Sequence, residues 1–247
     1  MKIKGIVFDK DGTLLDYDKC WRPVTLATVE YVGIRYPGSE VCREGVRKRL
    51  GVLPDGTMDI DGPHCRGFHD KIAMAFVDEY TLHGIKFELN TLMREVGEGF
   101  KLFLPVGDVE PICDNMREVL LKLKADGIKL GLITSDRIHG ARHTLARLGL
   151  EDSIFEVLLT NDGDHPAKPD PYYMGVFERE TGLAPDEILM VGDTFSDIEF
   201  GINSGTHTLG VGKSEKNRKK LATLAEYVAR DVSEIFEVLE KIENSEA

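Results

Sequence analysis

Two aspartates that follow an apolar stretch near the start of the chain have the types and spacing of a catalytic pair. The apolar stretch 5–8 is followed by Asp9, Lys10, Asp11 and Gly12. Two carboxylates separated by one residue can converge on a hard divalent cation such as Mg²⁺, which prefers oxygen ligands. A carboxylate beside a cation can also attack phosphorus while its neighbour moves the proton of the leaving group. We therefore predict that Asp9 is a nucleophile and Asp11 a general acid and base; for this stretch alone, a solvated turn is the alternative.

A second apolar run ends in small hydroxyl residues. The run 128–133 is followed by Thr134, Ser135 and Asp136, and then by apolar residues at helical spacing. Hydroxyls and free backbone N–H groups at the start of a helix are suited to binding phosphate oxygens. We predict that Thr134 and Ser135 bind phosphate; the alternative is that Ser135 or Asp136 is only the N-cap of the helix.

A lysine and a further pair of aspartates follow in the second half of the chain. Lys168 precedes a predicted helix start at Pro171, and an ammonium held there could neutralise a phosphate and a carboxylate nucleophile. Asp193 and Asp197 follow the apolar run 188–191, and their spacing lets both face one cation, one directly and the other through water. For each of these residues alone, a surface lysine or a capped turn is the alternative.

Along the chain, short apolar runs typical of buried strands alternate with segments whose apolar residues recur at helical spacing. This pattern predicts an α/β fold that positions the candidate residues. Open α/β sheets bind ligands beyond the carboxyl ends of their strands. Two acidic strand ends, one hydroxyl strand end and a lysine in the same chain therefore favour one shared site. The predicted strands are 5–8, 128–133, 155–159, 188–191 and 208–211.

The segment 17–107 interrupts this alternation. Its apolar residues recur at spacings of three and four, with turn-rich breaks between them, which predicts helices and no strand of the core. We therefore predict a core formed by 1–16 and 108–247, and a helical insertion over 17–107 that could close over the Asp9 loop as a lid. Candidate substrate contacts in the insertion, each with an ordinary surface or packing role as the alternative, are Trp21, Arg22, His64, Arg66 and His69.

The composition is that of a globular protein and narrows the classes of partner. The chain has 247 residues, of which 42% are hydrophobic and 30% charged, and a formal net charge of −12. This charge argues against nucleic acid or an anionic membrane surface as the main partner. No run fits a secretory signal or a membrane span, which makes the cytoplasm the expected location. Four cysteines without paired spacing indicate reduced thiols rather than a disulfide framework or a zinc site.

Four segments, taken in order, resemble the sequence motifs of the haloacid dehalogenase superfamily. They are residues 9–14 (DKDGTL), Thr134, Lys168 with Pro169, and residues 192–197 (GDTFSD). The resemblance implies a Rossmann-like, doubly wound parallel sheet with an inserted helical cap. A helical insertion directly after the first motif is similar to the small-cap subgroup, which includes phosphoglycolate phosphatase and β-phosphoglucomutase.

The same resemblance implies a role for each motif residue. Asp9 is the implied nucleophile and Asp11 the implied general acid and base, with Thr134 and Lys168 holding the phosphoryl group. The implied cofactor is Mg²⁺, bound by Asp9, by the backbone carbonyl of Asp11 and by Asp193, with Asp197 in support. The full set of predicted phosphate-binding residues is Gly12, Thr13, Thr134, Ser135 and Lys168.

One motif position departs from the family pattern. Lys10 stands where an apolar residue is common, and its charge lies next to the predicted nucleophile. Asp11 argues for phosphatase or mutase chemistry, because the dehalogenases lack this second aspartate. We therefore predict Mg²⁺-dependent hydrolysis of a small phosphorylated metabolite through an aspartyl-phosphate on Asp9, similar to phosphoglycolate phosphatase. The alternatives are a sugar-phosphate mutase and a non-catalytic, phosphate-binding regulatory module.

Overall fold

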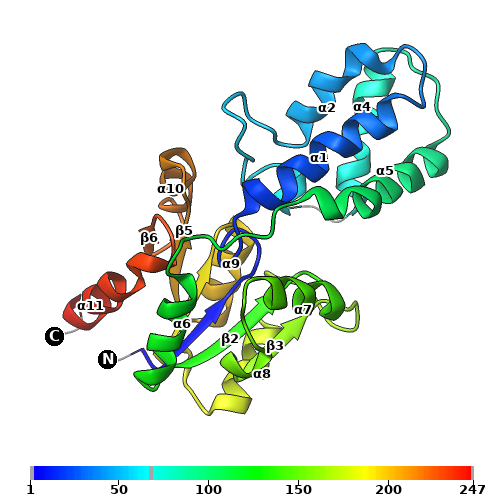
Figure 1. Cartoon of the computed structure of the whole chain (residues 1–247). Coiled ribbons are helices and arrows are strands. Elements are labelled where there is room, and N and C mark those ends of the chain that lie inside the picture. The colour runs from blue at the N-terminus through cyan, green and yellow to red at the C-terminus, as the bar shows by residue number, and fades with distance from the viewer. Residues whose placement is uncertain (1–2, 67–68, 246–247) are drawn as a thin grey trace. The chain divides into compact units, whose positions relative to one another are not determined.

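The computed structural model describes residues 3–66 and 69–245 of the chain (Figure 1). The polypeptide forms two compact units. One unit runs through Asp16 and resumes at Val109, and the other spans Tyr17–Asp108. The side chains of Arg66 and His69, two candidates from the sequence, lie outside the described set.

A six-stranded parallel sheet forms the centre of the first unit, in the order β3-β2-β1-β4-β5-β6. The strands are β1 (Gly5–Phe8), β2 (Lys129–Thr134), β3 (Val157–Thr160), β4 (Ile188–Gly192), β5 (His207–Val211) and β6 (Tyr227–Ala229). This arrangement confirms the predicted α/β class with a doubly wound parallel sheet. β6 adds to the predicted strands. This strand has three residues, of which only Ala229 is buried, so the sequence has no long apolar run there that would predict it.

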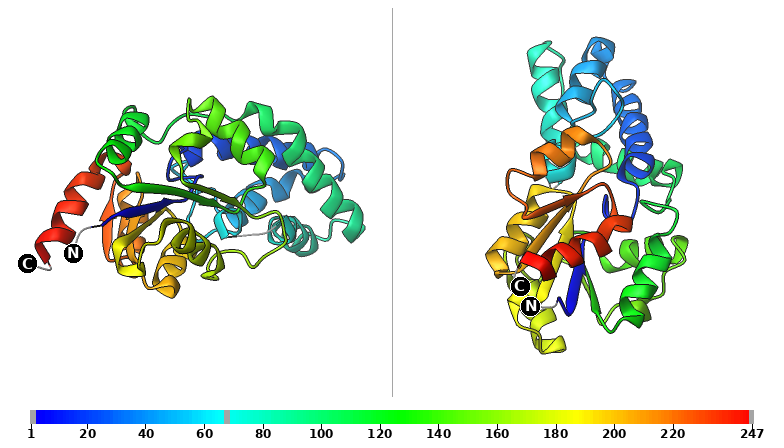
Figure 2. Two further views of the ribbon diagram at one scale, coloured as in Figure 1. Left: turned by 90° about the horizontal axis from the view of Figure 1, so that it is seen from below. Right: turned by 90° about the vertical axis from the view of Figure 1, so that its left-hand side faces the viewer.

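Helices cover both faces of this sheet (Figure 2). One face carries α6 (Met116–Ala125) and α7 (Ile138–Arg147), and the other carries α8 (Tyr172–Thr181) and α9 (Phe195–Ser204). The remaining helical segments of the unit are η3 (Asp152–Ile154), η4 (Pro185–Glu187), α10 (Glu215–Leu221), η5 (Val232–Glu234) and α11 (Ile235–Ser245). Because both faces are covered, the two central strands, β1 and β4, are apolar and buried along their whole length.

The order of the strands reverses between β1 and β4, and this switch point positions the candidate residues. Phe8 at the end of β1 lies opposite Leu132 of β2 and Val191 of β4. The backbone N–H of Asp9 extends the ladder by donating to the Val191 carbonyl at 2.9 Å. Sheets of this kind bind ligands beyond the carboxyl ends of the strands at the switch point. The loops after β1, β2 and β4 therefore place their side chains at one edge of the sheet.

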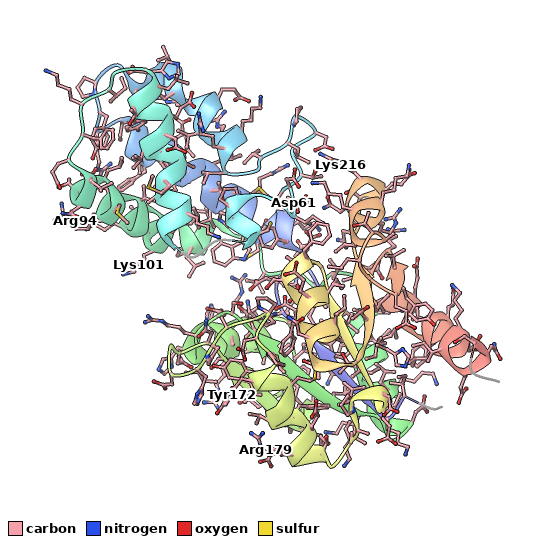
Figure 3. All side chains as sticks on the ribbon, turned by 180° about the vertical axis from the view of Figure 1, so that it is seen from behind. Asp61, Arg94, Lys101, Tyr172, Arg179 and Lys216 are labelled. Carbon is pink, nitrogen blue, oxygen red and sulfur yellow. The ribbon has the colours of Figure 1, made fainter. Side chains whose placement is uncertain are left out.

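The second unit is helical, and its described residues contain no strand. Its segments are α1 (Tyr17–Gly33), η1 (Ser39–Cys42), α2 (Arg43–Arg49), α3 (Pro63–Arg66), α4 (His69–Leu82), α5 (Leu89–Phe103) and η2 (Leu104–Val106). The unit has an apolar core of its own, in which Phe76 of α4 packs with Leu92 and Val96 of α5. Arg94 and Lys101 lie along the exposed side of α5 (Figure 3). This amphipathic pattern is the one that the sequence predicts for the segment.

Candidate active site

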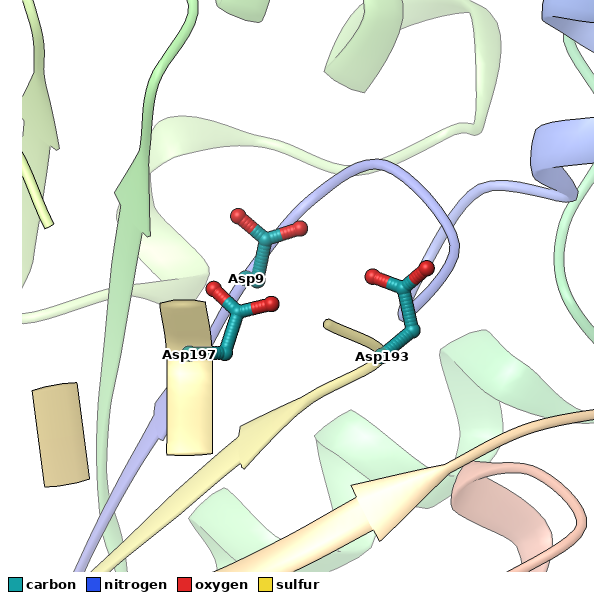
Figure 4. Close-up of side chains that lie close together, drawn as sticks. All are labelled: Asp9, Asp193 and Asp197. Atoms are coloured by element: carbon teal, nitrogen blue, oxygen red, sulfur yellow. The ribbon is translucent and has the colours of Figure 1, made fainter. Parts of the chain in front are cut away.

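Three aspartates converge beyond the carboxyl end of the sheet (Figure 4). Asp9 follows β1, Asp193 follows β4, and Asp197 lies in the first turn of α9. One carboxylate oxygen of each residue lies within 4.8 Å of the others, and all three residues are buried. The parallel pairing explains the convergence, since β1 and β4 are hydrogen-bonded neighbours whose ends lie side by side.

Lys168 joins this cluster from the loop between β3 and α8. Its ammonium group donates to Asp9 Oδ1 at 2.5 Å, to Asp197 Oδ1 at 2.6 Å and to the Ile133 carbonyl at 3.1 Å. The side chain is only 5% exposed. An ammonium has three hydrogens, and these three bonds account for all of them. Lys168 therefore has a fixed position between the nucleophile candidate and the end of β2.

Asp197 has both of its carboxylate oxygens engaged within the protein. Oδ1 accepts from Lys168, and Oδ2 accepts from the Thr194 backbone N–H at 3.0 Å and from the Thr194 hydroxyl at 2.6 Å. The Thr194 hydroxyl accepts in return from the Asp197 backbone N–H, which completes a capping box at the start of α9. Asp197 therefore orients Lys168 and begins α9, which favours a supporting role over direct metal binding.

Burial and mutual repulsion shift the protonation of the cluster. Burial raises the pKa of Asp9 to about 7; Lys168 opposes this shift, and the Asp197 and Asp11 carboxylates add to it. Burial also raises the pKa of Asp193 well above its usual value, with a further rise from Asp197 and Asp9. Burial alone would lower the pKa of Lys168, but the Asp197 and Asp9 carboxylates outweigh it and raise that pKa. The site holds more negative charge than Lys168 balances.

This excess of buried carboxylate fits a divalent cation. Asp193 Oδ1 is buried and has no hydrogen-bond partner among the described residues. A buried, unpaired carboxylate oxygen costs free energy unless another group satisfies it. Hard cations such as Mg²⁺ prefer oxygen ligands, and Mg²⁺ is usually bound by one or two protein carboxylates. Asp9 and Asp193 are therefore the side chains at this edge that could hold Mg²⁺.

Gly12, Thr13 and Leu14 form the tight turn between Asp11 and Leu15. Gly12 has a φ of +87°, and a Cβ at this position would overlap the Asp193 carboxylate. Glycine is required there for both reasons, because it tolerates positive φ and leaves room for the neighbouring side chain. Thr13 is fully buried, and its hydroxyl has no hydrogen-bond partner among the residues described. A buried hydroxyl without a partner fits a ligand oxygen as its missing acceptor.

Thr134 and Ser135 differ in their surroundings. Thr134 is buried at the end of β2, and its hydroxyl accepts from the Asp136 backbone N–H at 3.2 Å. It follows directly on Ile133, whose carbonyl binds Lys168, so it is tied to the aspartate cluster through the backbone. Ser135 is exposed. The geometry supports Thr134 more directly than Ser135 as a phosphate contact.

Asp11 pairs with Lys10 rather than joining the three clustered carboxylates. Lys10 is 1% exposed, and its ammonium lies 2.7 Å from Asp11 Oδ2 and 3.6 Å from Asp136 Oδ2. Burial would lower the pKa of Lys10, but the Asp11 and Asp136 carboxylates outweigh it and raise that pKa. The Asp11 side chain remains 22% exposed. We predict that Asp11 contacts the metal only through its backbone carbonyl. The ion pair with Lys10 involves the Asp11 side chain and leaves that carbonyl available.

Three contributors to the site were not assigned a role from the sequence. Thr194 had a readable signal, because a threonine three residues before an acidic residue at a helix start is typical of a capping box. Lys10 has no role predicted from the sequence, and Asp136 is considered there only as a helix N-cap, the position that Arg137 takes in α7. Lysines are usually exposed, so nothing in the sequence indicates that Lys10 is buried between two carboxylates.

The candidates in the helical unit have partners within that unit. Both ring nitrogens of His64 are engaged: Nδ1 with the Tyr17 hydroxyl, and Nε2 with the Thr25 hydroxyl at 3.1 Å. The Trp21 ring lies 5.7 Å from the His64 ring, measured between centroids. Arg22 donates to the Gly56 carbonyl at 3.0 Å. These contacts fit the ordinary surface or packing role that is the alternative for each of these residues.

The helices of the described residues are too short or too polar to cross a membrane.

A family model described as haloacid dehalogenase-like hydrolase matches residues 3–205 of the chain. Pyrophosphatase PpaX of Bacillus mycoides (strain KBAB4) is 29% identical over 248 residues, which cover 98% of this chain and 99% of that protein. These matches extend over the loops that carry the aspartate cluster and Lys168.

Two solved structures share the fold along nearly the whole chain. A predicted phosphoglycolate phosphatase from Haemophilus somnus 129pt has a TM-score of 0.67 at 19% identity, covering 96% of this chain and 98% of its own. A structure named "putative beta-phosphoglucomutase", from Thermotoga maritima, has a TM-score of 0.65 at 25% identity, covering 96% and 99%. The likeness to the first of these concerns the fold alone.

Proposed function

Because the chain belongs to the haloacid dehalogenase-like hydrolase family and is a phosphatase-type hydrolase, we propose that it hydrolyses a small phosphorylated metabolite with Mg²⁺. The observation that carries the proposal is the bond of Lys168 to Asp9, in a buried cluster that also contains Asp193. A carboxylate held by an ammonium beside a cation site is suited to attack phosphorus. We also propose that the protein acts in the cytoplasm.

Asp9 and Asp11 divide the covalent work in the proposed mechanism. An Asp9 carboxylate oxygen bonds to phosphorus as the bond to the leaving-group oxygen breaks, and Asp11 gives that oxygen a proton. Asp11 then takes a proton from water, whose oxygen attacks phosphorus. Inorganic phosphate leaves and the Asp9 carboxylate is restored.

Lys168 and the neighbouring loops stabilise charge during these steps. The Lys168 ammonium is already bonded to Asp9, so it keeps the nucleophile in place and lies near the charge that develops on the phosphoryl oxygens. We assign the phosphoryl oxygens to the hydroxyls of Thr13 and Thr134, with Ser135 and the backbone at Gly12 in support. When bound by Asp9, Asp193 and the Asp11 carbonyl, Mg²⁺ would neutralise negative charge on the phosphoryl group.

We assign substrate selection to the helical unit. It is inserted in the chain directly after the loop of Asp9 and Asp11 and returns at Val109, before α6. An inserted unit of this kind is suited to act as a cap that excludes water during reaction.

A phosphate-release assay tests the proposal. We expect the protein with Mg²⁺ to release inorganic phosphate from an aryl phosphate, and Asp9→Asn or a chelator to abolish the release. Asp186→Asn is the matched control, because it removes the charge of an exposed aspartate and should leave the rate unchanged. Full activity of Asp9→Asn would contradict the mechanism. A screen of phosphorylated metabolites should include phosphoglycolate, sugar phosphates and pyrophosphate, the last because of the relative named pyrophosphatase.

A sugar-phosphate mutase is the second candidate. The likeness to the structure named as a β-phosphoglucomutase, at 25% identity, favours it. A mutase returns the phosphoryl group to a sugar, whereas a phosphatase gives it to water. Product analysis with a sugar phosphate separates the two, since only the phosphatase releases phosphate in proportion to the substrate consumed. Binding of Mg²⁺ and phosphate without turnover of any ester would instead indicate a non-catalytic module.

A further inference from the structure

The Lys10 side chain is a buried cation at the same sheet edge that the proposed mechanism does not use. Its exposed fraction is 1%, and its ammonium lies 2.7 Å from Asp11 Oδ2. That separation is typical of a charge-assisted hydrogen bond. The second carboxylate that it faces, Asp136 Oδ2 at 3.6 Å, belongs to the loop after β2. Lys10 therefore connects the loop of the proposed acid with the loop of Thr134.

We propose that Lys10 is a positioning residue that holds the Asp11 carboxyl group where it exchanges a proton with the leaving-group oxygen. This inference rests on the proposed function, in which Asp11 is the general acid and base. Proton transfer needs the donor within hydrogen-bond reach of the leaving group, so the orientation of Asp11 affects the rate.

The Asp136 loop that Lys10 faces is itself fixed. The Asp136 backbone N–H donates to the Thr134 hydroxyl at 3.2 Å, and its carbonyl accepts from the Asn161 N–H at 3.0 Å. The Asp136 carboxylate also occupies the space that a Cβ on Gly140 would take. Lys10 therefore faces one carboxylate on a rigid turn and one on the partly exposed Asp11, and Asp11 is the side chain whose position it can determine.

Packing alone does not account for a lysine at this position. Burying an ammonium costs several kcal/mol of solvation before its partners compensate, and replacing a buried ion pair by apolar side chains is often neutral or stabilising. An apolar residue would fill the same space without that cost. The charge at Lys10 is therefore better explained by an effect on Asp11 than by stabilisation of the fold.

Leaving groups of different basicity test the inference in the full-length protein. Phenyl phosphate needs a proton on its leaving oxygen, whereas 2,4-dinitrophenyl phosphate releases a stable anion without one. We expect Lys10→Met to lower kcat/KM for phenyl phosphate by about 10²-fold, and for the dinitrophenyl ester by less than about threefold. Lys168→Met is the matched control, because this buried lysine contacts Asp9 instead; it should lower kcat/KM for both esters by similar factors.

A double-mutant cycle shows whether Lys10 acts through Asp11. In an Asp11→Asn background, Lys10→Met should lower kcat/KM for phenyl phosphate by less than about twofold further, because the group that it positions is already inactive. Lys10→Arg keeps the charge and should recover part of the phenyl phosphate activity. Lys10→Arg also serves if Lys10→Met fails to fold, since a displaced cation should still impair phenyl phosphate more than the dinitrophenyl ester.

Each result has a defined meaning. Equal losses on the two esters in Lys10→Met would overturn the inference, because they would place Lys10 on the phosphoryl group or in the fold; no loss on either ester would overturn it as well. A full additional loss in the Asp11→Asn background would show that Lys10 acts elsewhere. If the wild-type protein turns over neither ester, that result contradicts the proposed function itself, on which the Lys10 inference rests. Wild-type turnover without leaving-group selectivity in Lys10→Met removes the Lys10 inference alone.

Discussion

Each unit of the protein contains a buried carboxylate next to a cation, and the two settings differ in charge balance. At the sheet edge, Asp9, Asp193 and Asp197 lie together, and Lys168 bonds to two of them. In the helical unit, Glu79 is buried and accepts from Arg49 Nε at 2.7 Å. The first setting has excess negative charge on buried carboxylates. In the second, Glu79 and Arg49 form a matched pair, and the other carboxylate near Arg49, Asp78 Oδ2 at 3.6 Å, is exposed to solvent.

This difference separates a site built for a ligand from a contact built for the fold. A matched pair satisfies itself and holds α2 against α4, where Arg49 and Glu79 lie. The sheet edge leaves Asp193 Oδ1 and the Thr13 hydroxyl without partners among the described residues. Other buried polar atoms lack partners too, including the Thr28 hydroxyl of the helical unit, but among the described residues Asp193 Oδ1 is the one carboxylate oxygen in this state, and a buried, unpaired carboxylate is the costliest of them and indicates a ligand. Variants at the sheet edge and in the helical unit test this contrast.

Removing the nucleophile should have the largest effect. Asp9→Asn keeps the size of the side chain but cannot form the aspartyl-phosphate, so we expect kcat/KM for an aryl phosphate to fall by at least about 10⁴-fold. Steady-state kinetics measures the loss, with Asp186→Asn as the control for charge. A loss smaller than about tenfold would place the nucleophile elsewhere.

Removing the lysine that links the cluster should have the next largest effect. Lys168→Met takes away a cation bonded to Asp9 and Asp197, and we expect kcat to fall by about 10²–10³-fold. Circular dichroism checks that the fold is retained. Wild-type activity of this variant would contradict the assignment of charge stabilisation to Lys168.

Much of this arrangement could be predicted from the sequence, and the exceptions have physical causes. Asp9, Thr134 and Asp193 could be brought together in advance because each follows an apolar run, and parallel strands end at one edge of the sheet. The burial of Lys10 could not, because it depends on two loops that meet only in three dimensions. The sequence places Asp197 at the site as a supporting residue, but its bond to Lys168 could not be predicted, since it joins two different loops.

The unbalanced charge should also make stability depend on pH and on Mg²⁺. The Asp9 pKa is raised from 3.8 to about 7, so the folded, metal-free protein binds a proton that the unfolded chain releases at lower pH. Its free energy of unfolding should therefore fall as the pH rises from about 4 to about 7. Chemical denaturation at several pH values, with Mg²⁺ removed, measures this slope. A rise in stability over that range would contradict the assignment to the cluster.

Magnesium should restore the stability lost at the upper end of this range. At about 100 times its dissociation constant, a ligand that binds only the folded state raises the free energy of unfolding by about 2.7 kcal/mol. Asp193→Asn should remove most of this Mg²⁺-dependent gain, and denaturation with and without Mg²⁺ at pH 7 measures it. The same gain in Asp193→Asn as in the wild type would show that the ion binds elsewhere.

The matched pair in the helical unit should give the smallest effect, and it should be confined to stability. Glu79→Gln weakens the bond to Arg49, and we expect the melting temperature to fall by about 2–4 °C. We expect kcat/KM to change by less than about twofold, because a change in stability at a distant, independent site should have little effect on the reaction. A large loss of activity without a loss of stability would break the contrast between the two settings.

The central claim, that Asp9 carries the phosphoryl group, is tested most directly by trapping the intermediate. Asp11→Asn should form the aspartyl-phosphate from 2,4-dinitrophenyl phosphate, which needs no proton on its leaving group, but should hydrolyse it slowly for want of a base. Acid quenching, digestion and mass spectrometry then locate the added phosphoryl group. We predict that it lies on Asp9 in the peptide that contains residues 5–13. A phosphoryl group on any other residue, or none while the variant continues to turn over, would contradict the account.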